Sequence, residues 1–371
     1  MIKTTPLYNT HIRQKAKLTP FNGWLLPLEY KGILQEAESV RKKAGMFDVS
    51  HMGKIEIKGG QREEFLQRLT ANDISKIREG GVQYNIACNQ EGNIIDDFMV
   101  YVKEKSILCI VNASNTAILY DWFNAQKDGF DVEIEDLTSQ FSLIALQGPL
   151  SEKILSECLK INLQNLYYMN FIEIKWKNEN ILVSRTGYTG EDGFEICVSN
   201  NLVSSLWDEI FKVGVLQGLE LCGLGARDIL RLEMGYPLYG KDIDNTTNPL
   251  EANLMWIVKL YKDFIGKDRI MYYLNNGIKK RRCGFIMEDR GFPRTGYRIF
   301  SLNKSDIVGE VKSGVYSPNI KKFIGIGYLN TEVIAEGKEI FIEIRGKLYK
   351  AKIVNLPFIK PRTKRRRSYG G

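Results

Sequence analysis

The pattern of apolar residues changes after the basic stretch 279–282, and this change constrains the fold more than any other feature of the sequence. Short apolar segments separated by Gly, Pro and Asn turns run from there to Leu356. Residues 339–344 and 347–353 predict a hairpin about Arg345-Gly346. Several short strands at regular spacing are typical of a small β-barrel or a sandwich. We therefore expect a separate C-terminal β-domain.

The chain before residue 275 alternates between helical and strand patterns. Helices are predicted at 33–43, 61–69, 202–211 and 226–234, and strands at 54–58, within 84–101 on either side of a turn at 89–93, and at 107–111, 171–176 and 180–184. An apolar run at 141–146 precedes Gln-Gly-Pro and Ser151, which we expect to cap a further helix. This alternation favours an α+β class, with one subdomain over residues 51–137.

The low histidine count and the cysteine spacing narrow the chemistry open to the chain. Only His11 and His51 occur among 371 residues, which disfavours a histidine-based metal cluster and a Ser-His-Asp triad. The six cysteines show no C-x-x-C spacing and mostly lie in apolar runs, which favours buried thiols in a reducing compartment. Because no run of 18 apolar residues occurs, we expect no membrane-spanning helix.

The net charge of +8 is concentrated near the C-terminus. Six of the positive charges fall within eight positions and leave a net charge of about +2 on the rest of the chain. These residues are Lys360, Arg362, Lys364, Arg365, Arg366 and Arg367. We interpret 359–371 as a solvated basic tail. Binding of RNA or another acidic partner is the alternative interpretation, and RNA binding would weaken steeply with salt.

Two adjacent carboxylates, Asp96 and Asp97, occupy the start of a predicted apolar strand. Side chains alternate along a strand, so the two carboxylates point to opposite faces and one must face the interior or a cleft. A buried carboxylate is costly unless it is paired or hydrogen-bonded. The pair therefore indicates either a ligand contact or a turn that one aspartate closes while the other is solvated.

A glycine-rich loop at 185–196 reads Arg-Thr-Gly-Tyr-Thr-Gly-Glu-Asp-Gly-Phe-Glu-Ile. Its glycines allow the backbone to approach a ligand closely, and its aromatic residues offer ring faces. The spacing is not the G-x-G-x-x-G of dinucleotide sites. A carboxylate such as Glu195 suits an amino-pyrimidine edge with two N–H donors, while an ordinary surface loop is the alternative.

Several longer strings carry a resemblance to a known family. They are Phe-Asp-Val-Ser-His-Met-Gly (47–53), Ile-Ile-Asp-Asp (94–97), Val-Asn-Ala-Ser-Asn (111–115), Ala-Leu-Gln-Gly-Pro (145–149), the loop 185–196, Gly-Leu-Gly-Ala-Arg-Asp-Ile-Leu-Arg-Leu-Glu (223–233) and Asn-Pro-Leu-Glu-Ala (248–252). In these strings the chain closely resembles the T-proteins of the glycine cleavage system, which are folate-dependent aminomethyltransferases. The resemblance extends from Thr5 to Phe358.

The resemblance implies a fold of α+β class, a three-domain cloverleaf around a central folate cavity. Residues 1–50 and 138–275 would form a discontinuous folate-binding domain. Residues 51–137 would form an α+β domain that contributes Asp96, and 280–358 a small β-barrel followed by the basic tail 359–371.

The resemblance also implies a reaction. The aminomethyl group on the lipoyl arm of the H-protein passes its one-carbon unit to tetrahydrofolate, which yields 5,10-methylenetetrahydrofolate, ammonia and dihydrolipoyl H-protein. Asp96 matches the family's catalytic carboxylate, Glu195 its pterin-anchoring carboxylate and Arg227 a folate-contacting arginine. Further matches to folate-contacting positions are Tyr84, Asn112, Tyr188, Tyr236 and Arg362. No metal is implied.

Other functions fit parts of the sequence. Related proteins that serve iron-sulfur maintenance carry a Lys-Gly-Cys-Tyr-x-Gly-Gln-Glu string, which is absent here. The folate domains of sarcosine and dimethylglycine dehydrogenases are attached to a flavin domain, for which this chain has no room. A non-enzymatic folate-binding regulator, or a nucleic-acid binder acting through the tail, is the alternative to an enzyme.

The expected partners are lipoylated H-protein and folate, with no nucleic acid and no membrane. The first 28 residues lack Asp and Glu, which is typical of organellar presequences, but the resemblance already begins at residue 5. We therefore expect a bacterial cytoplasmic protein, with the mitochondrial matrix as the alternative.

Overall fold

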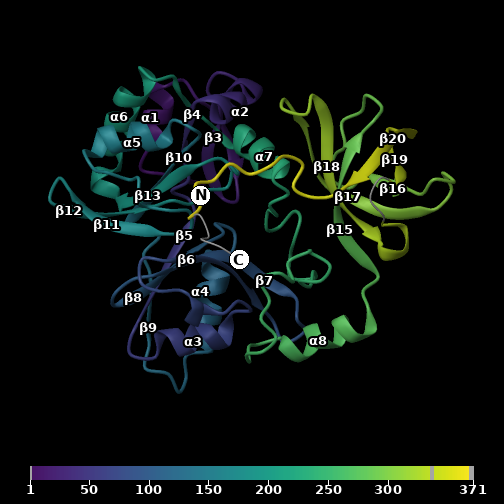
Figure 1. Cartoon of the computed structure of the whole chain (residues 1–371), viewed down its shortest axis with the longest axis horizontal. Coiled ribbons are helices and arrows are strands. Elements are labelled where there is room, and N and C mark those ends of the chain that lie inside the picture. Colours follow the sequence, from purple (N-terminus) through teal and green to yellow (C-terminus); the bar gives the residue numbers. More distant parts are fainter. Residues whose placement is uncertain (1, 335–337, 367–371) are drawn as a thin grey trace.

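Three lobes meet at the centre of the molecule in the computed structural model, which describes residues 2–334 and 338–366 (Figure 1). Two lobes are built on open sheets, and the third is a closed six-stranded barrel. The expected α+β class and C-terminal barrel are confirmed, and the alternative of a sandwich is excluded. None of the described helices is long and apolar enough to cross a membrane.

The first lobe contains a six-stranded sheet assembled from distant segments. Its spatial order is β11 (Phe171–Trp176), β12 (Glu179–Ser184), β13 (Gly193–Ser199), β10 (Phe141–Gln147), β4 (Ala44–Asp48) and β14 (Leu219–Leu221). Strand β4 pairs antiparallel with β10 and parallel with β14. The segment before residue 50 and the segment after residue 138 therefore share one sheet.

Helices cover both faces of this sheet. They are α1 (Tyr8–Arg13), α2 (Ile33–Lys42), α5 (Ser151–Leu159), α6 (Asn200–Val215) and α7 (Leu224–Glu233). Met46 and Ile144 pack with α5 and α6, whereas the next residues along the strands, Phe47 and Ala145, pack with α2 and α7. This is the alternation expected of strands buried on both faces. A small sheet of β1 (Lys3–Thr4), β3 (Trp24–Glu29) and β2 (Lys17–Phe21) adjoins the lobe.

The prediction that Ser151 caps a helix is wrong. The cap position of α5 is Leu150, and the Ser151 hydroxyl instead donates to the carbonyl oxygen of Asp192 at 3.3 Å. A tertiary contact with the 185–196 loop therefore replaces the local hydrogen bond that the sequence suggested.

The second lobe is an antiparallel sheet with helices on one face. Its spatial order is β6 (Val82–Cys88), β7 (Ile94–Val102), β8 (Ser106–Val111), β5 (Gly53–Lys58) and β9 (Glu133–Asp136). Helices α3 (Arg62–Leu69) and α4 (Thr116–Ala125) pack on it through Phe65 and Phe123, which contact the even-numbered residues Phe98 and Val100 of β7. From Asp97 onward, the odd-numbered side chains of β7 therefore face away from these helices.

The third lobe follows α8 (Lys267–Asn276) and is a barrel. Its strands, in order around the barrel, are β15 (Lys280–Met287), β18 (Lys322–Asn330), β17 (Ile307–Ser317), β16 (Arg298–Phe300), β19 (Glu339–Ile344) and β20 (Lys347–Val354), which pairs again with β15. The predicted hairpin joins β19 to β20. Arg345 and Gly346 both have positive φ, at 52° and 77°, as a two-residue turn of the mirror-image type requires.

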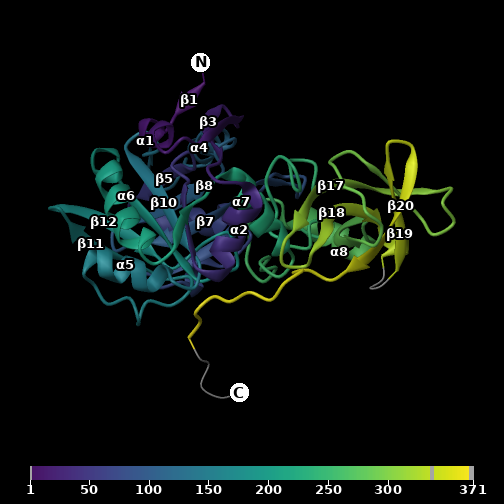
Figure 2. The ribbon, with the colours of Figure 1, turned by 90° about the horizontal axis from the view of Figure 1, so that it is seen from above.

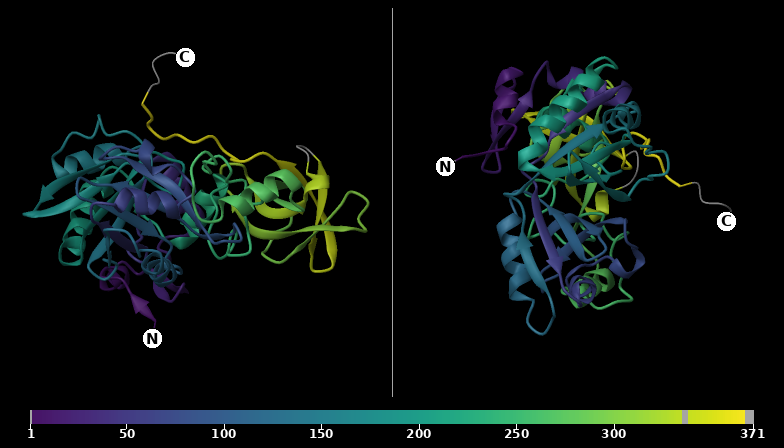
Figure 3. Two further views of the ribbon diagram at one scale, coloured as in Figure 1. Left: turned by 90° about the horizontal axis from the view of Figure 1, so that it is seen from below. Right: turned by 90° about the vertical axis from the view of Figure 1, so that its left-hand side faces the viewer.

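The basic segment after the barrel is a strap and not a solvated tail over residues 359–366. The backbone N–H of Arg362 donates to Gly190 at 2.7 Å, and the carbonyl of Lys364 accepts from Tyr168 at 2.9 Å. Lys364 also forms an ion pair with Glu152 at 2.9 Å. The strap returns to the first lobe on the face opposite β1 (Figures 2 and 3). Arg367 and the rest of the predicted tail lie outside the described residues.

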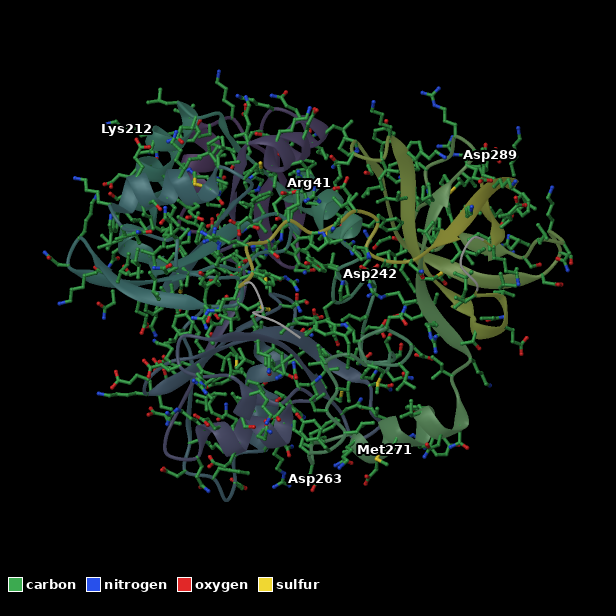
Figure 4. The ribbon with its side chains drawn as sticks, viewed as in Figure 1. Arg41, Lys212, Asp242, Asp263, Met271 and Asp289 are labelled. Atoms are coloured by element: carbon green, nitrogen blue, oxygen red, sulfur yellow. The ribbon has the colours of Figure 1, made fainter. Side chains whose placement is uncertain are left out.

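A buried ionic cluster joins the first lobe, the barrel and the strap, whose Arg362 binds Glu191. Arg41 of α2 binds Glu233 at 2.7 Å and Glu191 at 2.8 Å, and Glu233 also accepts from Ser317 of the barrel at 2.6 Å. The backbone N–H of Phe358 donates to the carbonyl of Glu233 at 2.9 Å. Figure 4 shows Arg41 at α2 in the first lobe. These contacts fix the angle at which the barrel meets the first lobe.

Candidate functional site

One cavity of about 1870 Å³ lies where the lobes meet. Ligand pockets for small molecules are typically about 300–1,000 Å³, so this cavity has room for more than one ligand group. Its lining includes Phe21 of the N-terminal sheet and Arg365 and Arg366 of the strap. Figure 2 shows the N-terminal sheet and the strap on opposite sides of the molecule. The residues predicted from sequence that line it are Tyr84, Asn112, Tyr188, Glu195, Arg227 and Tyr236.

The carboxylate that reaches this cavity from β7 is Asp97. Its neighbour Asp96 is fully buried and lies on the face that packs against the helices of the second lobe. Asn112 bridges the two, because its Nδ2 donates to Asp96 Oδ1 at 2.8 Å and to Asp97 Oδ1 at 2.9 Å. The expected division of the two aspartates between opposite faces is therefore present, with Asp97 on the cavity side.

Burial raises the pKa of both carboxyls, and repulsion between them raises it further at Asp96. At Asp97 the rise is opposed by hydrogen bonds from Tyr84 and Asn112 and by the positive charge of Arg282. Tyr84 donates to Asp97 Oδ2 at 2.8 Å, and its ring stacks on Trp256 at 6.0 Å. The pair is thus arranged so that Asp96 holds a proton more readily than Asp97 does.

Glu195 enters the cavity from the other open-sheet lobe. It lies on β13, where pairing with Ala145 and Ser184 fixes its backbone. Its Oε2 accepts a hydrogen bond from Thr186 at 2.6 Å, while Oε1 receives none from the described residues. Within the described residues, Glu195 therefore keeps one carboxylate oxygen without a donor, and Glu195 lines the cavity.

Arg227 and two tyrosines form a flat wall near Glu195. The Arg227 guanidinium lies 4.7 Å from the ring centroid of Tyr188, which stacks on Tyr236 at 5.7 Å. The Tyr188 hydroxyl donates to the carbonyl of Pro237, which fixes the ring. Burial lowers the pKa of Arg227, and the nearby negative charge of Glu195 opposes this. Such a wall can stack on a heteroaromatic ring and bind an anion or a carbonyl.

Two family models match consecutive parts of the chain. The GCVT N-terminal domain matches residues 7–262, and the glycine cleavage T-protein C-terminal barrel domain matches residues 280–360. The chain belongs to the glycine cleavage T-protein family.

Curated relatives and a solved structure agree with this membership. The aminomethyltransferase of Alkaliphilus oremlandii is 42% identical over 98% of this chain and 99% of its own, and that of Geobacillus thermodenitrificans is 42% identical over 97% and 99%. The crystal structure of the glycine cleavage system aminomethyltransferase T from Bartonella henselae has a TM-score of 0.93 at 32% identity and covers 98% of this chain and 100% of that chain. The predicted aminomethyltransferase activity is confirmed, and the non-enzymatic alternatives are not favoured.

Arg362 is the one predicted folate contact of this T-protein family member that lies away from the cavity wall. Its guanidinium binds Glu191 and donates to the carbonyl of Arg41 at 3.1 Å. Its position therefore supports a structural role in anchoring the strap and gives no support to a folate contact.

Several cavity residues of this T-protein family member were not predicted from sequence. They are Asp97, His51, Phe21, Trp256, Arg365 and Arg366. Asp97 had a signal, because its alternation with Asp96 required one of the two to face a cleft. Trp256 is 65% exposed, and nothing in its local sequence distinguishes it from an ordinary surface residue. The part of the chain that the structure describes contains no group of three His, Cys, Asp or Glu residues that could hold a metal ion.

Proposed function

We propose that the cavity binds tetrahydrofolate and receives the lipoyl arm of the H-protein, so that the one-carbon unit passes between them inside the protein. The observation that carries this proposal is one cavity of about 1870 Å³ with two carboxylates on different walls. One is Glu195, whose Oε1 accepts no hydrogen bond from the described residues, and the other is Asp97, which Asn112 links to the buried Asp96. The lining of this cavity reaches from the N-terminal sheet to the strap, which lie on opposite sides of the molecule in Figure 2, and this extent suits two substrates that enter separately.

Glu195 is the proposed anchor for the pterin ring. A 2-amino-pyrimidinone edge presents two N–H donors, which match the oxygens of a carboxylate. Tyr188 and Tyr236 would stack near the ring, and Arg227 would contact a carbonyl or carboxylate of the folate. Tyr84 and Asn112 act on the folate through Asp97, since both hydrogen-bond to it.

The reaction needs a group that manages protons and stabilises positive charge. The aminomethyl carbon bonds to N5 and N10 of tetrahydrofolate, and each of these nitrogens loses its proton. One proton leaves on the departing ammonia and the other on the dihydrolipoyl sulfur. We assign the reacting carboxylate to Asp97, because it lines the cavity, with Asp96 behind it as the protonated member of the pair. The sequence prediction of Asp96 for this role stays a prediction that the variants below decide.

The proposed location is the bacterial cytoplasm. The relatives described above are bacterial proteins, and all six cysteines are free thiols. A reducing compartment suits this arrangement.

A product assay tests the proposal. Purified protein is mixed with tetrahydrofolate and H-protein whose aminomethyl carbon is ¹³C-labelled, and the label is followed by NMR. We expect it to appear in the bridging methylene of 5,10-methylenetetrahydrofolate with one equivalent of ammonia. Omission of tetrahydrofolate or of H-protein is the control. Absence of labelled methylene in the complete mixture, with folded protein, would overturn the proposal.

A further inference from the structure

His51 lies in the turn between β4 and β5, where the chain crosses from the first lobe to the second. Hydrogen bonds from Val49 N–H to Leu143 O at 3.0 Å and from Met52 N–H to Val49 O at 3.1 Å hold this turn. The residue is only 3% exposed, yet it lines the cavity. Its side chain is therefore both fixed in place and in reach of a bound ligand.

The His51 ring has no hydrogen-bond partner among the described residues, and its Nδ1 is buried. The one aromatic contact that the His51 ring makes with the described residues is with Phe21, edge to face at 5.9 Å between ring centroids. His11, the other histidine, is the contrast, because Nε2 binds Asp48 and Nδ1 binds Tyr30, both at 2.8 Å. Buried polar groups in folded proteins are almost always satisfied, so an unsatisfied one at a cavity indicates a partner supplied from outside the chain.

The surroundings of His51 favour the uncharged imidazole. Burial lowers its pKa to about 3, and the charges of Arg227 and Lys54 add to this while Asp48 opposes it. A neutral imidazole has one N–H donor and one acceptor nitrogen. It therefore suits an uncharged polar group and not a carboxylate, which would favour the protonated ring.

We propose that His51 is a ligand-binding residue whose neutral ring hydrogen-bonds an uncharged polar group, an amide or a pterin ring edge, of the folate in the cavity. This inference rests on the proposed folate binding. It adds a contact on the wall formed by Phe21 and the β4–β5 turn, where none of the residues predicted from sequence lies.

Because the chain has only two histidines, ¹⁵N NMR of the full-length protein labelled at histidine ring nitrogens reports on each separately. The probe is 5-formyltetrahydrofolate, which is stable in air. On its addition we expect the His51 nitrogens to shift while one stays protonated and the other unprotonated, and the His11 signals to stay in place. Unchanged His51 signals in the folate-bound protein, or conversion of His51 to imidazolium, would overturn the proposal.

Two variants give a second measurement. His51→Phe keeps an aromatic ring against Phe21 but removes both nitrogens, and His51→Gln keeps a donor and an acceptor. We expect His51→Phe to weaken 5-formyltetrahydrofolate binding about 3- to 10-fold by calorimetry, and His51→Gln to recover part of the loss. Equal affinity of wild type and His51→Phe would reject the proposed role of His51 and leave the proposed folate binding intact. Failure of the wild type to bind would reject the proposed function as well.

Discussion

Two walls of the same cavity each present a carboxylate, and the groups that surround the two carboxylates differ. On the second lobe, Asp97 lies next to another carboxyl and is hydrogen-bonded by an amide and a phenol. On the first lobe, Glu195 is bonded by the hydroxyl of Thr186 and feels the positive charge of Arg227. Burial raises the pKa of the Asp97 carboxyl, and the positive charge of Arg282 opposes only part of that rise. We therefore expect proton transfer at Asp97 and ligand anchoring at Glu195.

The strongest way to break this comparison is Asp97→Asn with Asp96→Asn as its matched control. General acid-base assistance is typically worth about 10²- to 10⁴-fold, so we expect Asp97→Asn to lower kcat by that factor while folate affinity changes little. Asn resembles a protonated carboxyl, so Asp96→Asn should keep kcat within about 10-fold of wild type. Steady-state kinetics with aminomethylated H-protein measures both. The reverse order of the two losses would return the catalytic role to Asp96.

The second prediction concerns the anchoring wall. Loss of one partner from a buried charge-assisted pair costs about 2–5 kcal/mol, and we expect Glu195→Ala to weaken tetrahydrofolate binding by that amount. Calorimetry measures the affinity, and kcat at saturating folate should fall much less. A variant that binds folate as tightly as wild type would show that Glu195 does not anchor it.

The third prediction uses pH. The pKa of Asp97 is raised above the usual value of about 3.9 for aspartate. Because Asp97 acts in its ionised form, turnover should fall as the pH is lowered through this raised pKa. The hydrogen bond from Tyr84 stabilises the ionised form and lowers this pKa. Tyr84→Phe should therefore move the acid limb of the kcat profile to higher pH, by about one unit. An acid limb that stays in place would contradict the role of Tyr84.

The smallest effect is expected from Thr186→Val, the counterpart of Tyr84→Phe on the other wall. It removes the hydrogen bond to Glu195 Oε2, and we expect folate affinity to fall about 3- to 10-fold. The acid limb of the kcat profile should not move, because Glu195 is assigned no proton transfer. If the acid limb moved as far in Thr186→Val as in Tyr84→Phe, the two carboxylates would not have separate roles.

Local periodicity was enough to predict much of the fold. The helix at 33–43, the strands flanking the turn at 89–93 and the β19–β20 hairpin all occur within one or two residues of their predicted bounds. Each of these depends on residues close in sequence, and the Gly346 turn needs only its own backbone conformation.

The parts of the site that sequence could not give depend on distant residues. Alternation along the strand predicts that Asp96 and Asp97 point to opposite faces of the sheet. Which of these faces is covered depends on the packing of α3 and α4. The charges of Arg362 and Lys364 suggested a solvated tail because their partners, Glu191 and Glu152, lie far away in the chain. Six of the side chains that the family motifs indicated line the cavity, and their binding of folate stays a prediction.

The strap has a consequence for the order in which the protein is completed during synthesis. Arg362 and Lys364 follow every residue of both carboxylate walls in the chain, so they leave the ribosome after them, and they bind the 185–196 loop and α5. Until then Glu191 and Glu152 lack these cationic partners, and the Arg365–Arg366 side of the cavity does not exist. A nascent chain that already contains every residue of both carboxylate walls is therefore still an incomplete enzyme.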